Sequence, residues 1–271
     1  MGLPDADIFP HATGKASEVV AKHQSEVGPE GIKFYAGWFC PYVQRTWIAL
    51  LEKQIPFQYI EINPYHKDPS FLAINPKGLV PAIESQGSTL AESNILIEFL
   101  EDFADGSNSK SSRKLLPAAP QAKAVARMHI DQISKKIVPA WFRTIQAQDS
   151  QAQAQGRKDY TDALKEWATY IDDDKLHNGP FHGGDELDAV DINLAPFVAR
   201  EYLIEKHRGG PITAEETGET YQIWRKAILS HPSVVSTTSD KENYEPIYGR
   251  YLRDEAQSEA AQATRAGRAI P

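Results

Sequence analysis

Between residues 32 and 103, short β-prone runs alternate with helical stretches in a definite order. The β-prone runs are 32–35, 57–62, 80–84 and 88–90, and the helical stretches are 42–53, 69–73 and 93–103. A strand, a helix and a second strand in succession predict a parallel crossover. The last two strands are separated only by Ser85-Gln86-Gly87, which predicts a hairpin. The order βαβ, short helix, ββα therefore predicts one three-layer α/β unit over residues 31–104.

The rest of the chain predicts a second, all-helical unit. At 271 residues the chain exceeds a typical domain of about 100 to 150 residues. Residues 105–120 supply few apolar groups and end in two prolines, so we expect a linker there. Residues 121–250 are predicted to be all-α, with an irregular arm over residues 1–30 and a C-terminal helix or tail over 251–271. The helices expected in the second unit span 122–149, 157–176, 189–207 and 219–229.

Charge and cysteine content narrow the classes of function. The chain has 37 acidic and 29 basic residues, a net charge of −8. An acidic surface repels phosphate backbones and anionic lipids, so neither nucleic acid nor a membrane is expected as a partner. The single cysteine excludes an internal disulfide, and a free thiol is most easily maintained in a reducing compartment. We therefore expect a cytoplasmic protein.

That cysteine, Cys40, lies where a loop should pass into a helix. Pro41 suits the first helical position, and the positive end of a helix dipole favours a thiolate over a thiol. The alternative is that Cys40 is a small core residue, as most free cysteines are. A dithiol oxidoreductase would need a second cysteine at position 43, which holds Val43. Any disulfide must therefore form with an outside thiol, and glutathione fits that role best.

Three motifs together resemble the glutathione transferase family, specifically its cysteine-using omega class. They are Phe39-Cys40-Pro41-Tyr42-x-x-Arg45, Asn75-Pro76-x-Gly78-x-Val80-Pro81 and Glu92-Ser93, in this order along the chain. The resemblance covers about residues 31 to 250. It implies a thioredoxin-like α/β domain followed by an all-α domain, and it makes Cys40 the catalytic residue. The tyrosine- and serine-dependent classes place a hydroxyl at this position.

The resemblance also implies how glutathione binds. Val80 and Pro81 match a cis-proline turn that leaves the Val80 backbone free to pair with the cysteinyl part of the tripeptide. Glu92 and Ser93 match residues that hold its γ-glutamyl end, although a capping serine with an acidic neighbour is an equally natural interpretation. Lys67 matches a lysine at the glycyl end, and its alternative is a solvated surface residue.

The remaining candidates lie around the thiol and in the helical unit. Phe39 is expected to contact glutathione, while Arg45 could be a structural anchor and is not assigned to catalysis. Arg200 and Trp224 resemble residues of a second-substrate cleft, although helical aromatics are more often core. In the helical unit, Asp188 and Asp191 match the cap of a buried central helix. This pair is expected to stabilise the fold, with Asp191 buried and bonded to the preceding loop.

The expected activity is glutathione-dependent thiol transfer. The resemblance implies reduction of mixed disulfides and dehydroascorbate, deglutathionylation of small aromatic ketones, weak conjugation to halogenated aromatics, and a homodimer. The substrates are glutathione and a small electrophile or disulfide. The histidines lack close metal-ligand spacing, so no metal is expected. Two alternatives remain: a non-enzymatic binding or scaffold protein, such as a relative of intracellular chloride channels, and a zeta-like isomerase that uses glutathione.

Overall fold

Two compact units make up the protein. The computed structural model describes residues 8, 10–28, 30–66, 68–104, 109–173 and 179–270. The first unit comprises Met1–Leu116 and Pro232–Tyr244, and the second comprises Pro117–His231 and Glu245–Pro271. The boundary at residue 116 falls within the expected linker. The grouping differs from the expected division because residues 232–244 join the α/β unit.

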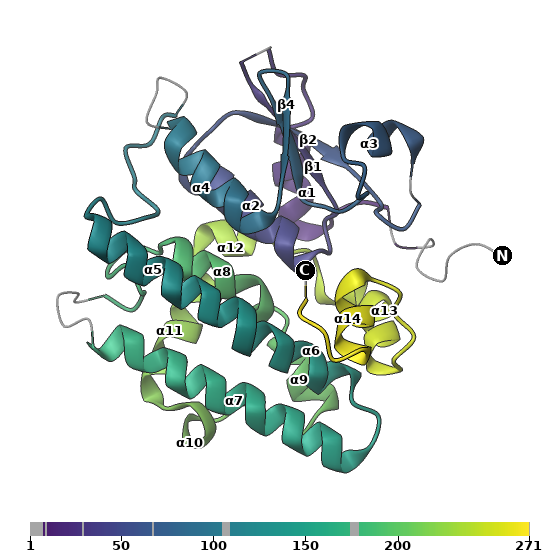
Figure 1. Ribbon diagram of the computed structural model, residues 1–271, viewed down its shortest axis with the longest axis vertical. Coiled ribbons are helices and arrows are strands. Elements are labelled where there is room, and N and C mark those ends of the chain that lie inside the picture. Colours follow the sequence, from purple (N-terminus) through teal and green to yellow (C-terminus); the bar gives the residue numbers. More distant parts are fainter. Residues whose placement is uncertain are drawn as a thin grey trace. The chain divides into compact units, whose positions relative to one another are not determined.

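A four-stranded mixed sheet forms the centre of the first unit (Figure 1). The strands are β1 (Ile32–Ala36), β2 (Phe57–Glu61), β3 (Ala82–Ser85) and β4 (Ser88–Ala91), in the spatial order β2-β1-β3-β4. β1 and β2 are parallel, and the other neighbours are antiparallel. The β3–β4 hairpin turns at Gln86 and Gly87, whose φ angles are 49° and 75°. This topology confirms the predicted thioredoxin-like fold class.

Helices α2 (Pro41–Glu52) and α4 (Ser93–Ala104) pack against each other (Figure 1). The sequence of α2 is apolar around most of the helix circumference, and nearly every residue of the helix is buried. The short α3 (Pro69–Ile74) begins after Asp68, whose carboxylate accepts from the Ser70 N–H. At the end of α2, Lys53 forms a buried ion pair with Glu101 of α4 at 3.0 Å.

The expectation of an irregular arm over residues 1–30 is wrong for α1 (Gly14–Lys22). This helix packs on α12 (Pro232–Ser236), a contact that local sequence cannot reveal. The Thr13 N–H donates to Ser239 Oγ at 3.1 Å, and the Asp240 N–H donates to Thr13 Oγ1 at 3.0 Å. Gly14 has φ +56°, and a Cβ there would lie 2.5 Å from Asp240. The helix therefore forms because residues 239 and 240 hold its start.

Residues 232–244 also pack against α2. Gln44 Nε2 donates to Thr237 Oγ1 at 3.1 Å and to Thr238 Oγ1 at 2.9 Å. Tyr244 packs its ring on Trp38, with centroids 5.0 Å apart. The α/β unit thus includes a segment that follows the helical residues in the chain.

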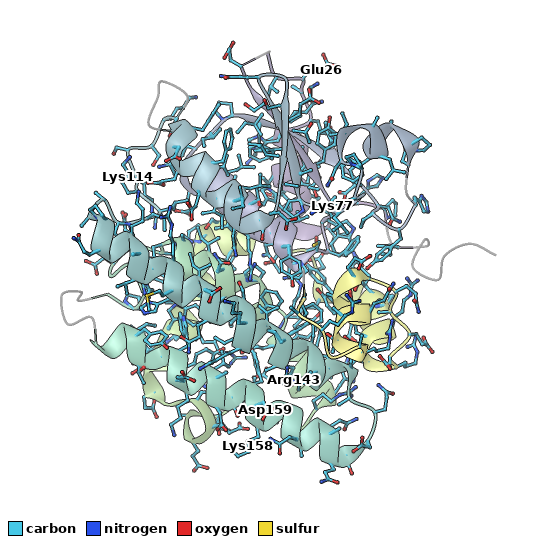
Figure 2. The ribbon with its side chains drawn as sticks, in the orientation of Figure 1. Glu26, Lys77, Lys114, Arg143, Lys158 and Asp159 are labelled. Atoms are coloured by element: carbon cyan, nitrogen blue, oxygen red, sulfur yellow. The ribbon has the colours of Figure 1, made fainter. Side chains whose placement is uncertain are left out.

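The second unit is built of helices, as expected. They are α5 (Pro120–Gln132), a π-helical turn (Ile133–Ile137), α6 (Val138–Gln146), α7 (Ser150–Asp173), α8 (Ala189–Val198), α9 (Glu201–His207), α10 (Ala214–Thr217), α11 (Glu219–Ser230), α14 (Glu259–Arg265) and the part of α13 (Lys241–Leu252) from Glu245 onward. The single helix expected over 122–149 is interrupted by the π turn, because Pro139 has no N–H to donate to the preceding turn. The long α7 runs beside α6, and Arg143 and Asp159 approach to 3.7 Å between them (Figure 2).

Helix α8 is the buried centre of the second unit. Asp188 caps its start, and Asp188 and Asp191 form a reciprocal capping box, as predicted. Asp191 is fully buried and accepts from the His182 N–H at 3.0 Å, which confirms the expected bond to the preceding loop. Its other partners are the Asp188 N–H at 2.8 Å and Trp224 Nε1 at 2.7 Å. Burial and the Asp188 charge raise the pKa of Asp191.

Candidate active site

Cys40 is the N-cap residue of α2, at the junction that the sequence predicts. Its backbone is extended, with φ −76° and ψ 125°, and Pro41 opens the first turn. The Cys40 N–H donates to the Gly37 carbonyl at 2.9 Å, which closes a tight turn after β1. The side chain is partly exposed. A sulfur held at the positive end of a helix, and reachable from solvent, meets the physical conditions for a reactive thiolate.

The thiol faces the turn that contains the cis peptide bond between Val80 and Pro81. Cys40 Sγ lies 3.8 Å from the Val80 carbonyl oxygen, within reach of a weak S–H hydrogen bond. Among the described residues, no hydrogen bond uses the Val80 N–H. The turn is held by Asn75, whose Nδ2 donates to the Leu79 carbonyl at 2.8 Å. The structure therefore brings the first two motifs together and leaves a backbone donor of the turn unused.

The third motif opens α4. Glu92 has φ +74°, an unusual backbone for a residue with a side chain, and its carbonyl accepts from the Leu96 N–H at 2.9 Å. Its carboxylate pairs with Lys77 at 3.1 Å (Figure 2 labels Lys77), and both side chains are more than half exposed. Ser93 is buried, with 8% of its surface exposed, and its Oγ accepts from Arg45 Nη1 at 3.4 Å.

Arg45, from the first motif, connects the start of α2 to the third motif through its bond to Ser93. Its guanidinium is buried and lies over the Tyr42 ring, 5.1 Å from the centroid. Burial lowers the pKa of Arg45 to about 10, so it remains charged at neutral pH and is close enough to interact electrostatically with Cys40. The anchoring role that the sequence left open is consistent with the Ser93 bond.

Sequence reasoning missed Glu61, at the end of β2. One carboxylate oxygen, Oε1, accepts from the Trp38 N–H at 3.0 Å, two residues before the thiol. Loss of solvation raises the pKa of Glu61 to about 8, although the hydrogen bond from the Trp38 N–H opposes the shift. A signal was available, because Glu61 continues the alternation of Phe57 and Tyr59, both of which are buried.

Phe39 and Trp38 are largely buried beside the thiol, at 6% and 1% exposure. Phe39 stacks on Tyr65 with centroids 6.1 Å apart, and Trp38 meets Phe39 edge to face. Their packing fixes the turn that carries Cys40. Lys67, the other predicted glutathione residue, lies outside the described residues.

Arg200 and Trp224 belong to the second unit. Trp224 is fully buried, donates to Asp191, and packs on Trp167 with centroids 4.5 Å apart. Arg200 is 1% exposed and donates to the Pro196 carbonyl at 2.6 Å. Both side chains therefore have partners within the core of their unit, and this placement gives no support to the prediction that they line a cleft.

The sheet order, the cysteine at the start of α2 and the cis-proline turn that it faces together place the protein in the class of thioredoxin-like folds that carry a thiol at this position. Residues 39–102 match the family model described as "Glutathione S-transferase, N-terminal domain". The solved structure of glutathione transferase Omega 3C from Trametes versicolor is 44% identical, with a TM-score of 0.80, over 92% of this chain and 100% of that one.

Curated relatives agree with the structural comparison. Glutathione S-transferase omega-1 of Sus scrofa is 29% identical over 89% of this chain and 96% of its own length. Glutathione S-transferase U19 of Arabidopsis thaliana is 30% identical over 76% of this chain and 88% of its own length. The chain belongs to the glutathione transferase family and is omega-like within it.

Two features are absent from the described residues. No group of three or more histidine, cysteine, aspartate or glutamate side chains within them could hold a metal ion. No helix in that part of the chain is both long and apolar enough to cross a membrane.

Proposed function

We propose that the protein is a glutathione-dependent thiol transferase in which Cys40 is the nucleophile. The observation that carries this proposal is the placement of the chain's only thiol, partly exposed at the start of α2 and 3.8 Å from the Val80 carbonyl. A glutathione disulfide lying along this turn would present its sulfur to Cys40. The similarity to omega-class relatives supports the same chemistry.

The reaction takes place in two exchanges. The Cys40 thiolate attacks the glutathione sulfur of a mixed disulfide, forming a Cys40–glutathione disulfide as the old S–S bond breaks and the other thiolate leaves with a proton. The thiolate of a second glutathione then attacks the bound glutathione sulfur, which yields oxidised glutathione and restores Cys40. One glutathione disulfide is formed for each mixed disulfide reduced. No second cysteine exists to resolve the adduct, so an external thiol must do it.

The tripeptide would bind mainly through backbone and charged groups. The unused Val80 N–H and its carbonyl can pair with the cysteinyl residue of glutathione, as in strand addition. Glu92, exposed at the start of α4, can receive the γ-glutamyl ammonium after exchanging its Lys77 partner. Ser93 and the first N–H groups of α4 would hold the neighbouring carboxylate. Lys67 is proposed for the glycyl end and Phe39 for the sulfur side.

The same cysteine accounts for the proposed range of substrates. Dehydroascorbate takes two electrons from two glutathione molecules, and a glutathionyl ketone loses its glutathione when Cys40 attacks the sulfur and the carbon takes a proton. Conjugation to halogenated aromatics should be weak, because it needs the ionised sulfur of glutathione in the place where Cys40 acts. A reducing compartment such as the cytoplasm would keep this thiol available.

An intact-mass measurement tests the proposal. After incubation with oxidised glutathione, the wild-type chain should gain one glutathione, and Cys40→Ser should gain none. Glutathione should remove the adduct, and Cys40→Ser should lose thiol transfer almost completely. Because the chain has no other cysteine, any adduct reports on this site alone. Full thiol-transfer activity in Cys40→Ser would overturn the mechanism, while a protein that binds glutathione without forming an adduct would favour the binding or scaffold alternative.

A further inference from the structure

One ion pair joins the loop before the cis-proline turn to the start of α4. Lys77 Nζ lies 3.1 Å from Glu92 Oε1, and the two side chains are 68% and 55% exposed. Lys77 belongs to the second motif and is labelled in Figure 2, and Glu92 belongs to the third. Within the described residues, the Glu92 carboxylate has no other ion-pair partner. The carboxylate proposed to receive the ammonium group of glutathione is therefore already paired with an ammonium group of the protein.

The backbones of both members of this pair are held in place. The Asn75 side chain accepts from the Lys77 N–H at 3.3 Å and donates to the Leu79 carbonyl at 2.8 Å, so it fixes Lys77 relative to the cis-proline turn. Glu92 has φ +74°, and its carbonyl accepts from the Leu96 N–H at 2.9 Å in the first turn of α4. The exposed stem of Lys77 keeps its rotational freedom. Its ammonium group can therefore change partner at little cost.

The residue after Glu92 is suited to bind an anion. Ser93 Oγ accepts from Arg45 Nη1 at 3.4 Å, and both side chains are buried. A serine hydroxyl that accepts a hydrogen bond in this way keeps its own hydrogen for another acceptor. Ser93 also opens α4, where a carboxylate is favoured by the helix dipole. The start of α4 thus presents a site for an ammonium group and, at the next residue, a site for a carboxylate.

The γ-glutamyl end of glutathione carries its ammonium and carboxylate groups on the same carbon atom. When the ammonium group binds Glu92, the carboxylate must therefore lie close to the place that the Lys77 ammonium group occupied. Lys77 left in solvent would be an unpaired charge beside an anion. Lys77 turned toward the ligand carboxylate would leave all four charges paired, which is the arrangement of lower electrostatic energy.

We propose that Lys77 and Glu92 form an exchangeable ion pair that selects ligands with an α-amino acid end: the ligand ammonium group takes Glu92, and Lys77 moves to the ligand carboxylate. This inference deepens the proposed function and rests on it. It makes Lys77 a specificity-determining residue, because a ligand with one of the two charges opens the pair without replacing both halves. A ligand with the ammonium group alone leaves Lys77 unpaired, and one with the carboxylate alone leaves Glu92 unpaired.

Isothermal titration calorimetry with two unreactive ligands tests the exchange. One is S-methylglutathione, and the other is its analogue with a γ-aminobutyryl group in place of γ-glutamyl, which lacks only the α-carboxylate. Lys77→Gln should weaken the binding of S-methylglutathione about fivefold, because the carboxylate loses its partner. The same variant should bind the analogue at least as tightly as the wild type does, because this ligand no longer has to displace Lys77. A general disturbance of the fold would weaken both.

Two further variants control for charge. Lys33→Gln removes the cation of a partly exposed pair with Glu84 on the sheet and changes the net charge equally. It should leave both affinities within about twofold of the wild type. Lys77→Arg keeps the positive charge and should retain most of the affinity for S-methylglutathione.

Tighter binding of S-methylglutathione to Lys77→Gln would overturn the exchange, because it would show that Lys77 merely occupies Glu92. Equal weakening of both ligands, no change in either, or a wild type that binds neither would also overturn it. The S-methyl ligands cannot form a disulfide, so these affinities do not depend on the chemistry of Cys40. Thiol transfer is judged separately by the intact-mass adduct. A chain that forms the adduct without the exchange keeps the proposed function and loses this inference.

Discussion

At the scale of single residues, the site separates into features that a local pattern can predict and features that it cannot. Cys40 and the Val80–Pro81 turn follow from motif and position, because a helix start and a strand start are local events. The alternation of Phe57 and Tyr59 could have indicated that Glu61 is buried, but its bond to the Trp38 amide, 23 positions away in the chain, could not be predicted from a local pattern. Arg200 and Trp224 lie in the core of their unit. A helical sequence alone does not reveal which aromatic or cationic side chains pack inward.

The protonation of Glu61 should appear in the stability of the fold. Its folded-state pKa of about 8 lies above the ordinary value of 4.5, so the folded chain holds a proton that the unfolded chain has released in this window. Stability should therefore fall as pH rises from about 4.5 to 8, by at most about 1.4 kcal/mol per pH unit. Glu61→Gln should remove this slope.

Urea unfolding at about pH 5, about pH 6.5 and about pH 8 measures this slope directly. Glu84→Gln is the control: Glu84 lies on the same sheet in a partly exposed pair with Lys33, and its replacement should leave the pH dependence of the wild type unchanged. Parallel curves for the wild type and Glu61→Gln would argue against a raised Glu61 pKa.

At the scale of elements, the strands and α2 to α4 were predictable because their periodicity and turn residues act locally. Helix α1 was not, since its start is fixed by residues 239 and 240. The interruption before α6 follows from the missing amide of Pro139, a local cause whose effect on helix type is seen only in three dimensions. Helix α8 was predicted together with its cap, because all the residues of a capping box lie within four consecutive positions of the sequence.

Asp191→Ala should destabilise the second unit strongly. The change leaves three buried donors without their acceptor, on His182, Asp188 and Trp224. We expect a loss of about 3 kcal/mol or more in the free energy of unfolding, or failure to fold. Thr213→Ala, which removes the exposed capping box of α10, is the control and should cost about 1 kcal/mol or less. Both losses are measured by urea unfolding. Equal losses would show that burial of the α8 cap does not increase its contribution to the free energy of unfolding.

At the scale of the whole molecule, we propose a homodimer that uses the exposed apolar side chains of α5. Val125 and Met128 lie one turn apart and are 46% and 68% exposed. Met128→Glu should shift the protein from dimer to monomer in analytical ultracentrifugation, because it places a charge in an apolar contact. Ile223→Glu on α11, where the native side chain is 59% exposed, should remain dimeric. A monomeric wild type, or a dimer unaffected by Met128→Glu, would reject this surface.

The membership of residues 232–244 in the α/β unit has a consequence for the order of events on the ribosome. Thr237 and Thr238, which hold Gln44, and Tyr244, which covers Trp38, are made only after the helices from α5 to α11. The nascent thioredoxin-like layer must therefore remain uncovered on one flank until the helices from α5 to α11 have been synthesised. A fragment that stops at residue 116 lacks that cover, so Cys40 belongs to a unit that can be completed only after the intervening helical residues have been made.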